Sequence, residues 1–391
     1  MPELSIVIPC LNEAASLGLC LQKANTFLST HHIDGEVIVA DNCSSDGSRD
    51  IAIANNAIVI TEEERGYGCA LRAGIGAASG RYVIMGDADD SYDFSAMLPL
   101  LLALRNGAEL VMGNRFKGTI HKGAMPFLHR YLGNPVLSFI GRLFFRIPVG
   151  DFYCGLRGFS IEAYRKMDLK TKGMEFALEM IVKAAFHQLR IAEVPIDLYK
   201  DQRNRPSHLR TWHDGWKGFR FLLLFSPRWL FLYPGIALFF FGLLGSGLLI
   251  AGPVIIDGKR FDVHTLMYTS ASILLGFQFI SLYFFSRIFT TVTGLLPVRP
   301  YFLGAYQKYF TLERGIFIGI ALIAGGLYLN IRSLLYWRST GFSNLDPFLV
   351  LRWVIPSVVL LVMGVQLILS FFYASILRLR ITSSLTKDNI H

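Results

Sequence analysis

The chain has 391 residues, of which 52% are hydrophobic and only 17% are charged, and its mean hydropathy is +0.43. An average soluble protein has about 25% charged residues. This composition excludes collagen-like, disordered and disulfide-scaffold proteins. Of the 38 basic and 29 acidic side chains, 50 fall in residues 1–228 and 17 in residues 229–391, which predicts a polar head followed by a membrane domain.

The net charge of +9 is also unevenly distributed. Residues 1–104 hold 5 basic and 14 acidic side chains, residues 105–228 hold 21 and 10, and residues 229–391 hold 12 and 5, so their net charges are −9, +11 and +7. A basic block before a membrane domain favours anionic headgroups or lipid phosphates as partners. The sequence contains no known nucleic-acid-binding motif, so we expect no nucleic-acid partner.

The first 115 residues alternate short apolar runs with helix-like stretches. The runs are β-branched or bulky, as buried parallel strands are; they are Leu4–Pro9, Glu36–Ala40, Ala57–Ile60, Tyr82–Met85 and Leu110–Met112. The helix-like stretches between them are 13–28, 48–55, 67–78 and 95–105. This pattern predicts a doubly wound α/β domain, in which ligands bind beyond the carboxyl ends of the strands.

Polar clusters follow three of the predicted strands, at 9–13, 41–48 and 86–90. Taken singly, each cluster fits an ordinary loop in which Asn12 and Asp46 cap helices and Gly47 allows a turn. Three clusters at strand ends together favour a ligand site. Asp87 and Asp89 are one residue apart, and such a pair can share a Mg²⁺ ion that keeps coordination positions open for substrate phosphates.

A dinucleotide dehydrogenase is the main α/β alternative. However, neither Gly66-Tyr67-Gly68 nor Gly74-Ile75-Gly76 completes GxGxxG, neither follows the first predicted strand, and the sequence has no Walker A motif. These glycines instead predict close packing and a flexible loop that covers a ligand.

Two later stretches are amphipathic but too polar to cross a membrane. Met125–Arg146 is rich in Phe and Leu and has Arg142 and Arg146 at helical spacing, and residues 216–229 read WKGFRFLLLFSPRW. Both predict interfacial helices that are cationic toward headgroups and apolar toward acyl chains, with a helix of the protein core as the alternative.

Four uncharged runs follow, at Trp229–Ile256, Val263–Ser286, Gly315–Ile331 and Trp353–Leu377. A bilayer core requires about 20 residues of helix, and aromatic and basic residues near the ends of the runs favour membrane spans over a buried helical core. The predicted domains are a catalytic head (1–215), an interfacial amphipathic connector (216–228), a four-helix transmembrane domain (229–380) and a tail (381–391).

The basic residues near these spans predict the orientation. An even number of spans places head and tail on one side, and the loops of that side hold more Lys and Arg than the opposite loops, which favours the cytoplasm. Residues 1–10 lack the basic start and cleavage site of a secretory signal, and five irregularly spaced cysteines fit reduced thiols. We therefore expect an integral protein of the inner cell membrane with a cytoplasmic head and tail.

The motifs occur in an order that resembles family-2 glycosyltransferases, and most closely their polyprenyl-phosphate (dolichyl or undecaprenyl) branch. They cover about residues 1–228 and are IVIPCLNE (6–13), ADNCSSDGS (40–48), GDADD (86–90), GNRF (113–116), DFYCGLRGFS (151–160), GMEFALE (173–179) and EVPI (193–196). The resemblance implies an α/β, Rossmann-like GT-A fold for the head. It also implies a Mg²⁺ or Mn²⁺ ion and inverting transfer of one sugar from UDP or GDP to a lipid phosphate.

For the donor, the resemblance implies a set of contacts: Pro9, Leu11 and Glu13 around the base and ribose, Asp41 on the base, and Asp87 and Asp89 on the metal and the diphosphate. Arg203 and Arg205 resemble a mobile arginine loop that closes on the diphosphate, and Ser207 is a further substrate-binding candidate. Two positions depart from the family pattern: Asn42 replaces a frequent second Asp, and Ser91 replaces a metal-binding Gln. These departures affect base recognition and metal affinity.

For the acceptor, the resemblance implies that Arg115 faces the phosphate and that Asp151 lies near the reacting centre, with Arg157 in the same loop. The implied catalytic set is Asp89, Asp151 and Arg115. A metal and arginines stabilise the charge that develops on a leaving nucleoside diphosphate. A phosphate acceptor needs little deprotonation, so Asp151 is expected to orient or weakly assist. The structural alternatives are an Asp151 salt bridge with Arg157 or Arg146, a solvated Arg115, and an (i, i+4) pair of Glu175 and Glu179 on a structural helix.

The sequence thus predicts transfer of a single hexose to a polyprenyl phosphate, with glucose from UDP-glucose favoured over mannose from GDP-mannose. A processive polysaccharide synthase is one alternative, but neither Arg228-Trp229 nor Arg352-Trp353 completes its QxxRW motif. A catalytically silent lipid-binding scaffold is another, and it would tolerate Asn at 87 and 89. Expected partners are the nucleotide sugar, the lipid and the membrane, with a homo-oligomer, a flippase or a downstream glycosyltransferase as further candidates.

Overall fold

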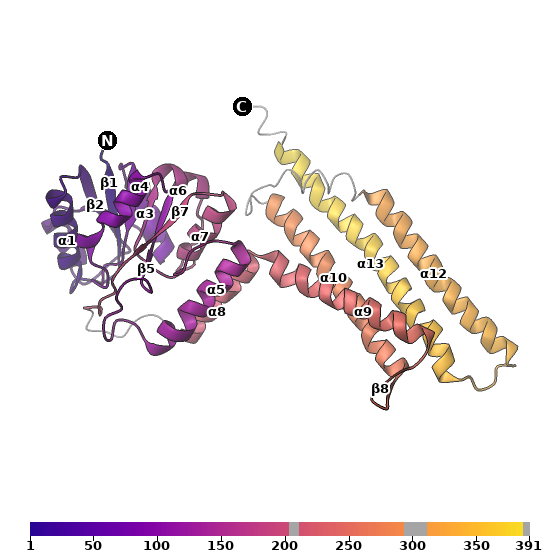
Figure 1. Ribbon diagram of the computed structural model, residues 1–391. Helices are drawn as coiled ribbons and strands as arrows, with labels where there is room; N and C mark the ends of the chain where they lie inside the picture. Colours follow the sequence, from indigo (N-terminus) through magenta and orange to yellow (C-terminus); the bar gives the residue numbers. More distant parts are fainter. Residues whose placement is uncertain (203–210, 293–310, 386–391) are drawn as a thin grey trace. The chain divides into compact units, whose positions relative to one another are not determined.

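The computed structural model describes residues 1–202, 211–292 and 311–385. It divides into two compact units, Met1–Phe225 and Ser226–His391. The first unit is a seven-stranded sheet with helices, and the second is built mainly of long helices (Figure 1).

The sheet of the first unit has the strand order β3-β2-β1-β4-β6-β5-β7. Its strands are β1 (Leu4–Cys10), β2 (Gly35–Asp41), β3 (Ile58–Thr61), β4 (Tyr82–Met85), β5 (Leu110–Asn114), β6 (Arg157–Ser160) and β7 (Ile191–Pro195). The five predicted strands are all present. β6 is antiparallel to both of its neighbours, β4 and β5, whereas every other pair is parallel. The sheet is therefore mixed, and not wholly parallel as the apolar runs predicted.

Helices cover both faces of this sheet. One face packs against α1 (Leu17–Thr30), α2 (Ser48–Ala54) and α4 (Leu98–Arg105), and the other against α3 (Tyr67–Ala77), α6 (Ile161–Met167) and α7 (Phe176–Phe186). Along β1, Ile6 and Ile8 belong to the first core and Val7 to the second, because side chains alternate along a strand. Burial on both faces explains why the strands are continuous apolar runs.

Two further helices of this unit pack against each other, α5 (Asn134–Phe145) and α8 (Thr211–Leu224). They lie side by side in Figure 1, and a π-helical turn at His129–Gly133 leads into α5. Helix α5 falls within the predicted amphipathic stretch Met125–Arg146, whereas α8 begins before the predicted stretch at 216–229 and overlaps it. Ser138 of α5 and Leu222 of α8 are fully buried, so each helix has one side inside the protein.

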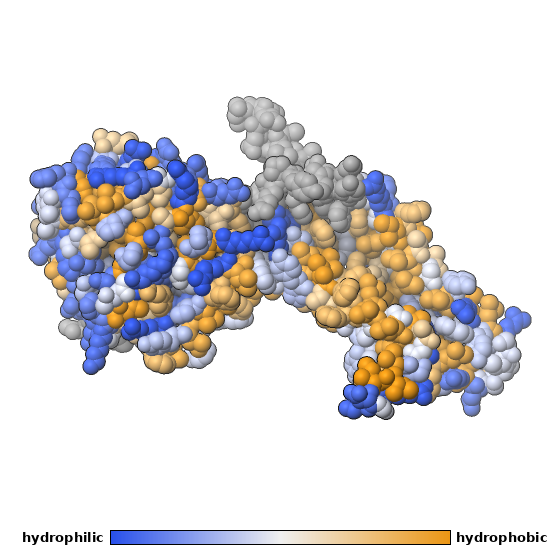
Figure 2. All heavy atoms as spheres, viewed as in Figure 1, coloured by the Kyte–Doolittle hydropathy of each residue, from blue (hydrophilic) through white to orange (hydrophobic). Residues whose placement is uncertain are grey.

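The second unit contains the four helices predicted to cross a membrane. They are α9 (Tyr233–Ala251), α10 (Val263–Val292), α12 (Leu312–Ser339) and α13 (Pro347–Leu385), with a short hairpin of β8 (Val254–Ile256) and β9 (Lys259–Phe261) between the first two. The apolar segments long enough to span are Arg228–Ala251, Val263–Thr290, Leu312–Ser339 and Pro347–Leu377. Orange apolar side chains gather over these helices in Figure 2.

Small residues bring these helices together in pairs. A Cβ on Gly242 of α9 would lie 2.7 Å from the backbone nitrogen of Ile273 on α10, and one on Gly326 of α12 would lie 2.9 Å from the carbonyl of Ser357 on α13. The Ser357 hydroxyl donates a 2.8 Å hydrogen bond to the Gly326 carbonyl. Close backbone approach at glycine and serine is typical of helices packed in a membrane.

Candidate active site

The loops that carry the predicted site residues meet at one edge of the sheet. β1, β2 and β4 are parallel, so their carboxyl ends face the same way. Because β6 is antiparallel, its first residue, Arg157, lies opposite Met85 at the end of β4 and opposite Met112 on β5. The loop at 151–156 therefore enters the edge where β4 and β5 end, which is the edge that binds ligands in open α/β sheets.

The loops after β1 and β2 are tied to each other by hydrogen bonds. The Asn12 amide donates to Ser44 Oγ at 2.9 Å, and the Ser45 amide donates to Asn12 Oδ1 at 2.8 Å. The Ala14 amide donates to Asp46 Oδ2 at 3.0 Å. Asn12 and Asp46 thus link the loops after β1 and β2 instead of only capping helices.

The four residues expected to bind the base and ribose lie at the carboxyl ends of β1 and β2 or on the loop after β1. Asp41, at the end of β2, is buried and accepts a 3.2 Å hydrogen bond from the Ser44 amide. Pro9 is half-buried, Leu11 is exposed and Glu13 is buried. The structure thus gathers the expected donor-binding residues at the ends of two adjacent strands.

The departure from the family pattern at Asn42 has a structural explanation. Its buried amide nitrogen donates to the carbonyls of Glu62 (2.8 Å) and Glu64 (2.9 Å), and its oxygen accepts from the Gly66 amide (2.8 Å). An aspartate could not make the first two bonds because it has no donor. Asn42 therefore anchors the segment that leads into α3.

Asp87 lies in the loop after β4, between a tyrosine and a glycine. The hydroxyl of Tyr67, the first residue of α3, donates to Asp87 Oδ1 at 3.1 Å. Burial, together with the charge of Asp87, raises the pKa of Tyr67 well above its usual value, so this hydroxyl stays protonated. On the other side a Cβ on Gly155 would overlap Asp87 Oδ2, so only glycine leaves room for the carboxylate as it stands.

Asp89 and Asp90 in the same loop have different surroundings. Asp89 Oδ1 accepts hydrogen bonds from the hydroxyl (2.6 Å) and amide (3.1 Å) of Ser91, and its carbonyl accepts from the Gln202 amide at 3.2 Å. Asp90 forms an ion pair with Lys23 at 2.7 Å. Ser91, the second departure from the family pattern, therefore holds the Asp89 carboxylate.

Asp87 and Asp89 are the residue type that holds a divalent cation when substrate supplies the other ligands. Within the described residues no group of three or more His, Cys, Asp or Glu side chains is placed to hold a metal. Mg²⁺ is commonly held by one or two carboxylates together with substrate phosphates and water. Asp87 and Asp89 are two such carboxylates, and both lie in the loop after β4.

Arg115 and Asp151 form a buried, two-bonded ion pair. Arg115 Nε donates to Asp151 Oδ2 at 2.6 Å and its terminal nitrogen donates to Oδ1 at 2.8 Å. Asp151 is fully buried and the Arg115 side chain is 10% exposed. The alternatives paired Asp151 with Arg157 or Arg146 and left Arg115 solvated. In the structure Asp151 forms its ion pair with Arg115, which is buried.

Arg157 is fully buried and holds the loop that carries Asp151. Its guanidinium donates to the carbonyls of Cys154 (2.8 Å), Phe152 (3.0 Å) and Ala177. Burial lowers the pKa of Arg157 from its usual value. These contacts join the 152–154 loop to α7, so the described geometry gives Arg157 a positioning role.

Glu179, in the GMEFALE motif, has a structural role. It is buried, its Oε1 pairs with Lys183 one helical turn later at 3.0 Å, and its Oε2 accepts from the amides of Lys170 (3.0 Å) and Thr171 (2.8 Å). The next carbonyl, of Lys172, accepts from the Gly68 amide at 2.9 Å. Glu179 thus supports the start of α3, where Tyr67 lies.

Three residues of the described site were not predicted as site residues: Tyr67, Tyr92 and Glu193. The Tyr92 hydroxyl accepts from the Gly155 amide at 2.9 Å, and Glu193 accepts from the amides of Gly150 and Asp151. In the sequence, Tyr67 stands between two glycines and Glu193 is the first residue of the EVPI motif, and these features could have marked both as site residues. The predicted residues Arg203, Arg205 and Ser207 lie outside the described part of the chain.

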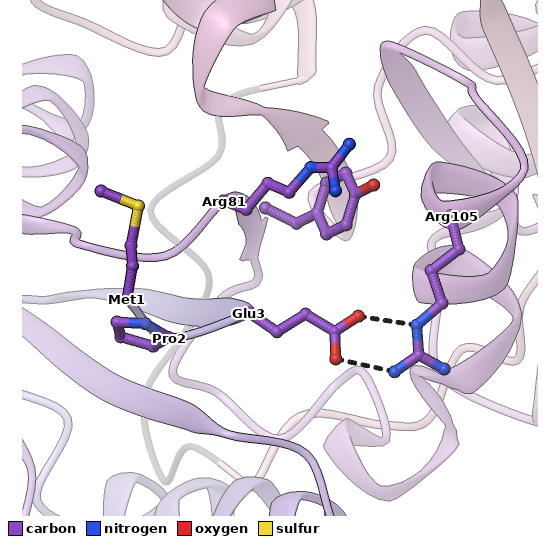
Figure 3. Close-up of a pocket in the computed structure, with 6 residues that line it drawn as sticks. Met1, Pro2, Glu3, Arg81 and Arg105 are labelled. Atoms are coloured by element: carbon purple, nitrogen blue, oxygen red, sulfur yellow. Dashed lines mark hydrogen bonds and ion pairs between the residues drawn. The ribbon is translucent and has the colours of Figure 1, made fainter.

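A pocket of about 480 Å³ lies at the other edge of the sheet (Figure 3). It is lined by Met1, Pro2, Glu3, Arg81, Tyr82 and Arg105. Glu3 and Arg105 form a two-bonded ion pair at 2.6 and 2.8 Å across it. Since Glu3 precedes β1 and Tyr82 begins β4, this pocket is at the amino ends of the strands, away from the site.

Two family models match the chain. A glycosyl transferase family 2 model matches residues 5–168, and a model of the glycosyltransferase family 2 C-terminal transmembrane region matches residues 284–378. The low-salt glycan biosynthesis hexosyltransferase Agl6 of Haloferax volcanii is 36% identical over 375 residues, which cover 95% of this chain and 88% of the relative. The chain therefore belongs to glycosyltransferase family 2.

A dolichyl-phosphate hexose transferase of the same organism is 29% identical, over 50% of this chain and 82% of the relative. Among solved structures, glucosyl-3-phosphoglycerate synthase from Mycobacterium tuberculosis aligns with a TM-score of 0.46 and 24% identity, over 57% of this chain and 80% of that one. The predicted branch and the GT-A-like head with its transmembrane region are confirmed. The protein is a membrane-embedded glycosyltransferase.

Proposed function

We propose that this glycosyltransferase transfers one hexose, with inversion, from a nucleotide sugar to a polyprenyl phosphate. Glucose from UDP-glucose is favoured over mannose from GDP-mannose. The observation that carries the proposal is the position of the Arg115–Asp151 pair, whose loop packs directly on two helices with exposed apolar and cationic faces. The similarity to a dolichyl-phosphate hexose transferase supports the same acceptor.

The donor half of the site consists of the linked loops after β1 and β2 and the loop after β4. Asp41 is the base-recognition residue, and Pro9, Leu11 and Glu13 surround the base and ribose. Asp87 and Asp89 hold a Mg²⁺ or Mn²⁺ ion, which supplies charge stabilisation for the leaving diphosphate when bound. The family resemblance adds an arginine loop with Arg203 or Arg205 as the diphosphate contact, and Ser207 as a further substrate-binding residue; all three lie outside the described residues.

The acceptor half is the Arg115–Asp151 pair. A phosphate monoester has a second pKa of about 6 and is largely ionised at pH 7, so it needs a cation more than a base. Both oxygens of Asp151 are engaged by Arg115. Asp151 therefore orients the guanidinium toward the phosphate, and Asp89, Arg115 and Asp151 form the catalytic set.

The acceptor loop packs on the inner sides of α5 and α8. Ser138 Oγ on α5 accepts from the Phe152 amide at 3.1 Å, and a Cβ on Gly141 would meet the Phe152 ring. A Cβ on Gly218 of α8 would meet the hydroxyl of Tyr153. Any surface that these two helices contact is therefore one helix away from the acceptor loop.

The outer sides of the same helices suit a lipid surface. Phe139 on α5, Trp212 and Trp216 on α8, and Phe127 and Tyr131 in the segment that leads into α5 are 56 to 78% exposed. Arg142, Arg146, Lys217 and Arg220 are exposed among them, and polar and apolar side chains are interspersed over these helices in Figure 2. Cations beside aromatic side chains are typical of helices in the interface of anionic bilayers.

The connectivity of the chain supports this assignment. α8 ends at Leu224, and the first membrane-spanning segment begins at Arg228. Three residues extended span about 10 Å, so the end of α8 must lie at the membrane surface. The proposal therefore includes an interfacial connector over 216–228. The basic loops near the spans support a cytoplasmic head and a location in the inner membrane.

Donor and acceptor can be identified with one labelling experiment. Purified full-length protein in detergent is incubated with polyprenyl phosphate, Mg²⁺ and, in separate reactions, radiolabelled UDP-glucose, GDP-mannose or a UDP-linked amino sugar. We expect label from one hexose donor in the organic phase, and its loss with Asp89→Asn. If no donor labels the lipid while the folded protein still binds nucleotide, the acceptor assignment fails, and the processive-synthase or scaffold functions take its place.

A further inference from the structure

Glu193 connects the two segments that carry the acceptor residues. It lies on β7, opposite Met112 of β5, and its side chain is 7% exposed. Its Oε1 accepts from Asn114 Nδ2 (2.9 Å), from the Asp151 amide (3.3 Å) and from the Gly150 amide. One carboxylate oxygen thus holds the end of β5 and the start of the acceptor loop together.

The first connection controls the turn that carries Arg115. With its nitrogen fixed on Glu193, the Asn114 side chain directs Oδ1 to the amides of Phe116 (2.9 Å) and Lys117 (3.1 Å). These amides flank the arginine on its carboxyl side. The orientation of the Asn114 amide therefore depends on Glu193, and the turn depends on the Asn114 amide.

The second connection places the backbone of Asp151. The amides of Gly150 and Asp151 both point at Glu193 Oε1, so the position of Asp151 Cα is fixed from behind the ion pair. The other carboxylate oxygen, Oε2, pairs outward with Lys117 Nζ at 2.6 Å, a side chain that is 57% exposed. The charge of Glu193 is thus balanced at the surface.

We propose that Glu193 is the positioning residue for the Arg115–Asp151 pair, and that it aligns the Arg115 guanidinium on the acceptor phosphate without touching substrate. The inference rests on the acceptor assignment made above. Since the carboxylate joins segments 79 and 42 residues away in sequence, its removal releases both partners of the pair at once. Alignment within 1 Å is worth about 10²-fold in rate at a reacting centre.

The test measures transfer by full-length protein while acceptor and donor concentrations are varied separately. We expect Glu193→Ala to lower kcat/KM for polyprenyl phosphate about 10²-fold, with the KM for the nucleotide sugar within twofold of wild type. Glu193→Gln keeps an oxygen that can face the three donors, so we expect it to retain activity within about threefold. Lys117→Ala, which removes only the exposed pairing, is the matched control and keeps wild-type kinetics.

A second variant reaches the same contacts without removing the carboxylate. A Cβ on Gly150 would lie 2.6 Å from Asn114 Nδ2 and 3.3 Å from Glu193 Oε1, so Gly150→Ala displaces the Asn114 amide. We expect it to reproduce the acceptor-specific loss, which keeps the proposal testable if Glu193→Ala does not fold. In an Asp151→Asn background, Glu193→Ala should lower the remaining activity less than threefold, because both changes act through one pair.

Several results would overturn the proposal. They are wild-type acceptor kinetics in both Glu193→Ala and Gly150→Ala, a KM for the nucleotide sugar that rises well beyond twofold in these variants, or an additive loss in the Asp151→Asn background. Failure of the acceptor assignment gives a different result, because wild-type protein would then label no lipid at all.

Discussion

The glycine beside Asp87 offers the sharpest perturbation of the donor half of the site. In Gly155→Ala the added Cβ would overlap Asp87 Oδ2 and lie 3.1 Å from both Asp87 Cγ and Tyr92 Cε2. The φ of Gly155 lies outside the left-handed region, so alanine can adopt this backbone. The substitution therefore acts on the carboxylate and leaves the chain path in place.

The size of the effect follows from the displacement. To restore ordinary contact the Asp87 carboxylate must move by about 1 Å, and a misplacement of that size at a reacting centre lowers the rate about 10²-fold. This factor corresponds to about 2.7 kcal/mol in the activation barrier. Overpacking of this kind lowers stability by about 1–3 kcal/mol, which leaves the protein folded if its stability is that of an ordinary domain.

The assay is transfer to lipid at a series of Mg²⁺ concentrations. We expect Gly155→Ala to need more Mg²⁺ for half-maximal activity and to have a kcat about 10²-fold lower. Gly76→Ala is the matched control, because its Cβ would meet nothing within 4 Å. If Gly155→Ala matches Gly76→Ala in both kcat and Mg²⁺ requirement, Asp87 is not the metal carboxylate.

Three further predictions concern the described residues. Asp151→Asn leaves Arg115 buried without its counter-charge, so we expect the free energy of unfolding to fall by about 3 kcal/mol. The unfolding temperature, measured by intrinsic fluorescence, should then fall by about 6–12 °C. An unchanged unfolding temperature would show that the pair is not buried in solution. Cys43 is the exposed cysteine of the donor loops, and bound nucleotide sugar should slow its alkylation, which mass spectrometry reports; equal rates with and without donor would place the base elsewhere. Burial acts to raise the pKa of Glu36, but hydrogen bonds from serine hydroxyls and from backbone amides, that of Ser79 included, outweigh it and lower the pKa. Its carboxylate therefore stabilises the fold above the unfolded pKa, and this contribution is lost as the pH falls through the folded pKa. Glu36→Gln should lower the unfolding temperature at pH 7, and the difference should vanish in the acid range; a difference that persists there would contradict the shift.

The features that could be predicted from sequence are those with a local signal. A buried strand is a short apolar run, so the five predicted strands were found, and the polar clusters that directly succeed β1, β2 and β4 marked the loops that meet at the carboxyl ends of these strands. The four spans were found because a bilayer requires long uncharged helices. Each of these inferences needs only residues that are neighbours in the chain.

The features that could not be predicted depend on pairing across the fold. β6 is a short run, Arg157–Ser160, whose direction is set by the path of the loop before it. The partner of Asp151 is 36 residues away, and sequence offered Arg157 and Arg146 as equally good cations. The distance in sequence between Glu193 and Asn114 likewise hides their contact. Such pairings become visible only once the register of β5, β6 and β7 is known.

The mass of the intact lipid product tests directly whether the enzyme transfers a single hexose to polyprenyl phosphate. Polyprenyl phosphate is incubated with the full-length protein, Mg²⁺ and the donor that labels the lipid, and the extracted lipid is measured by mass spectrometry. We expect a single new species, heavier than the acceptor by one hexose residue and absent with Asp89→Asn. A ladder of added hexoses, or a product that Asp89→Asn still forms, would contradict it.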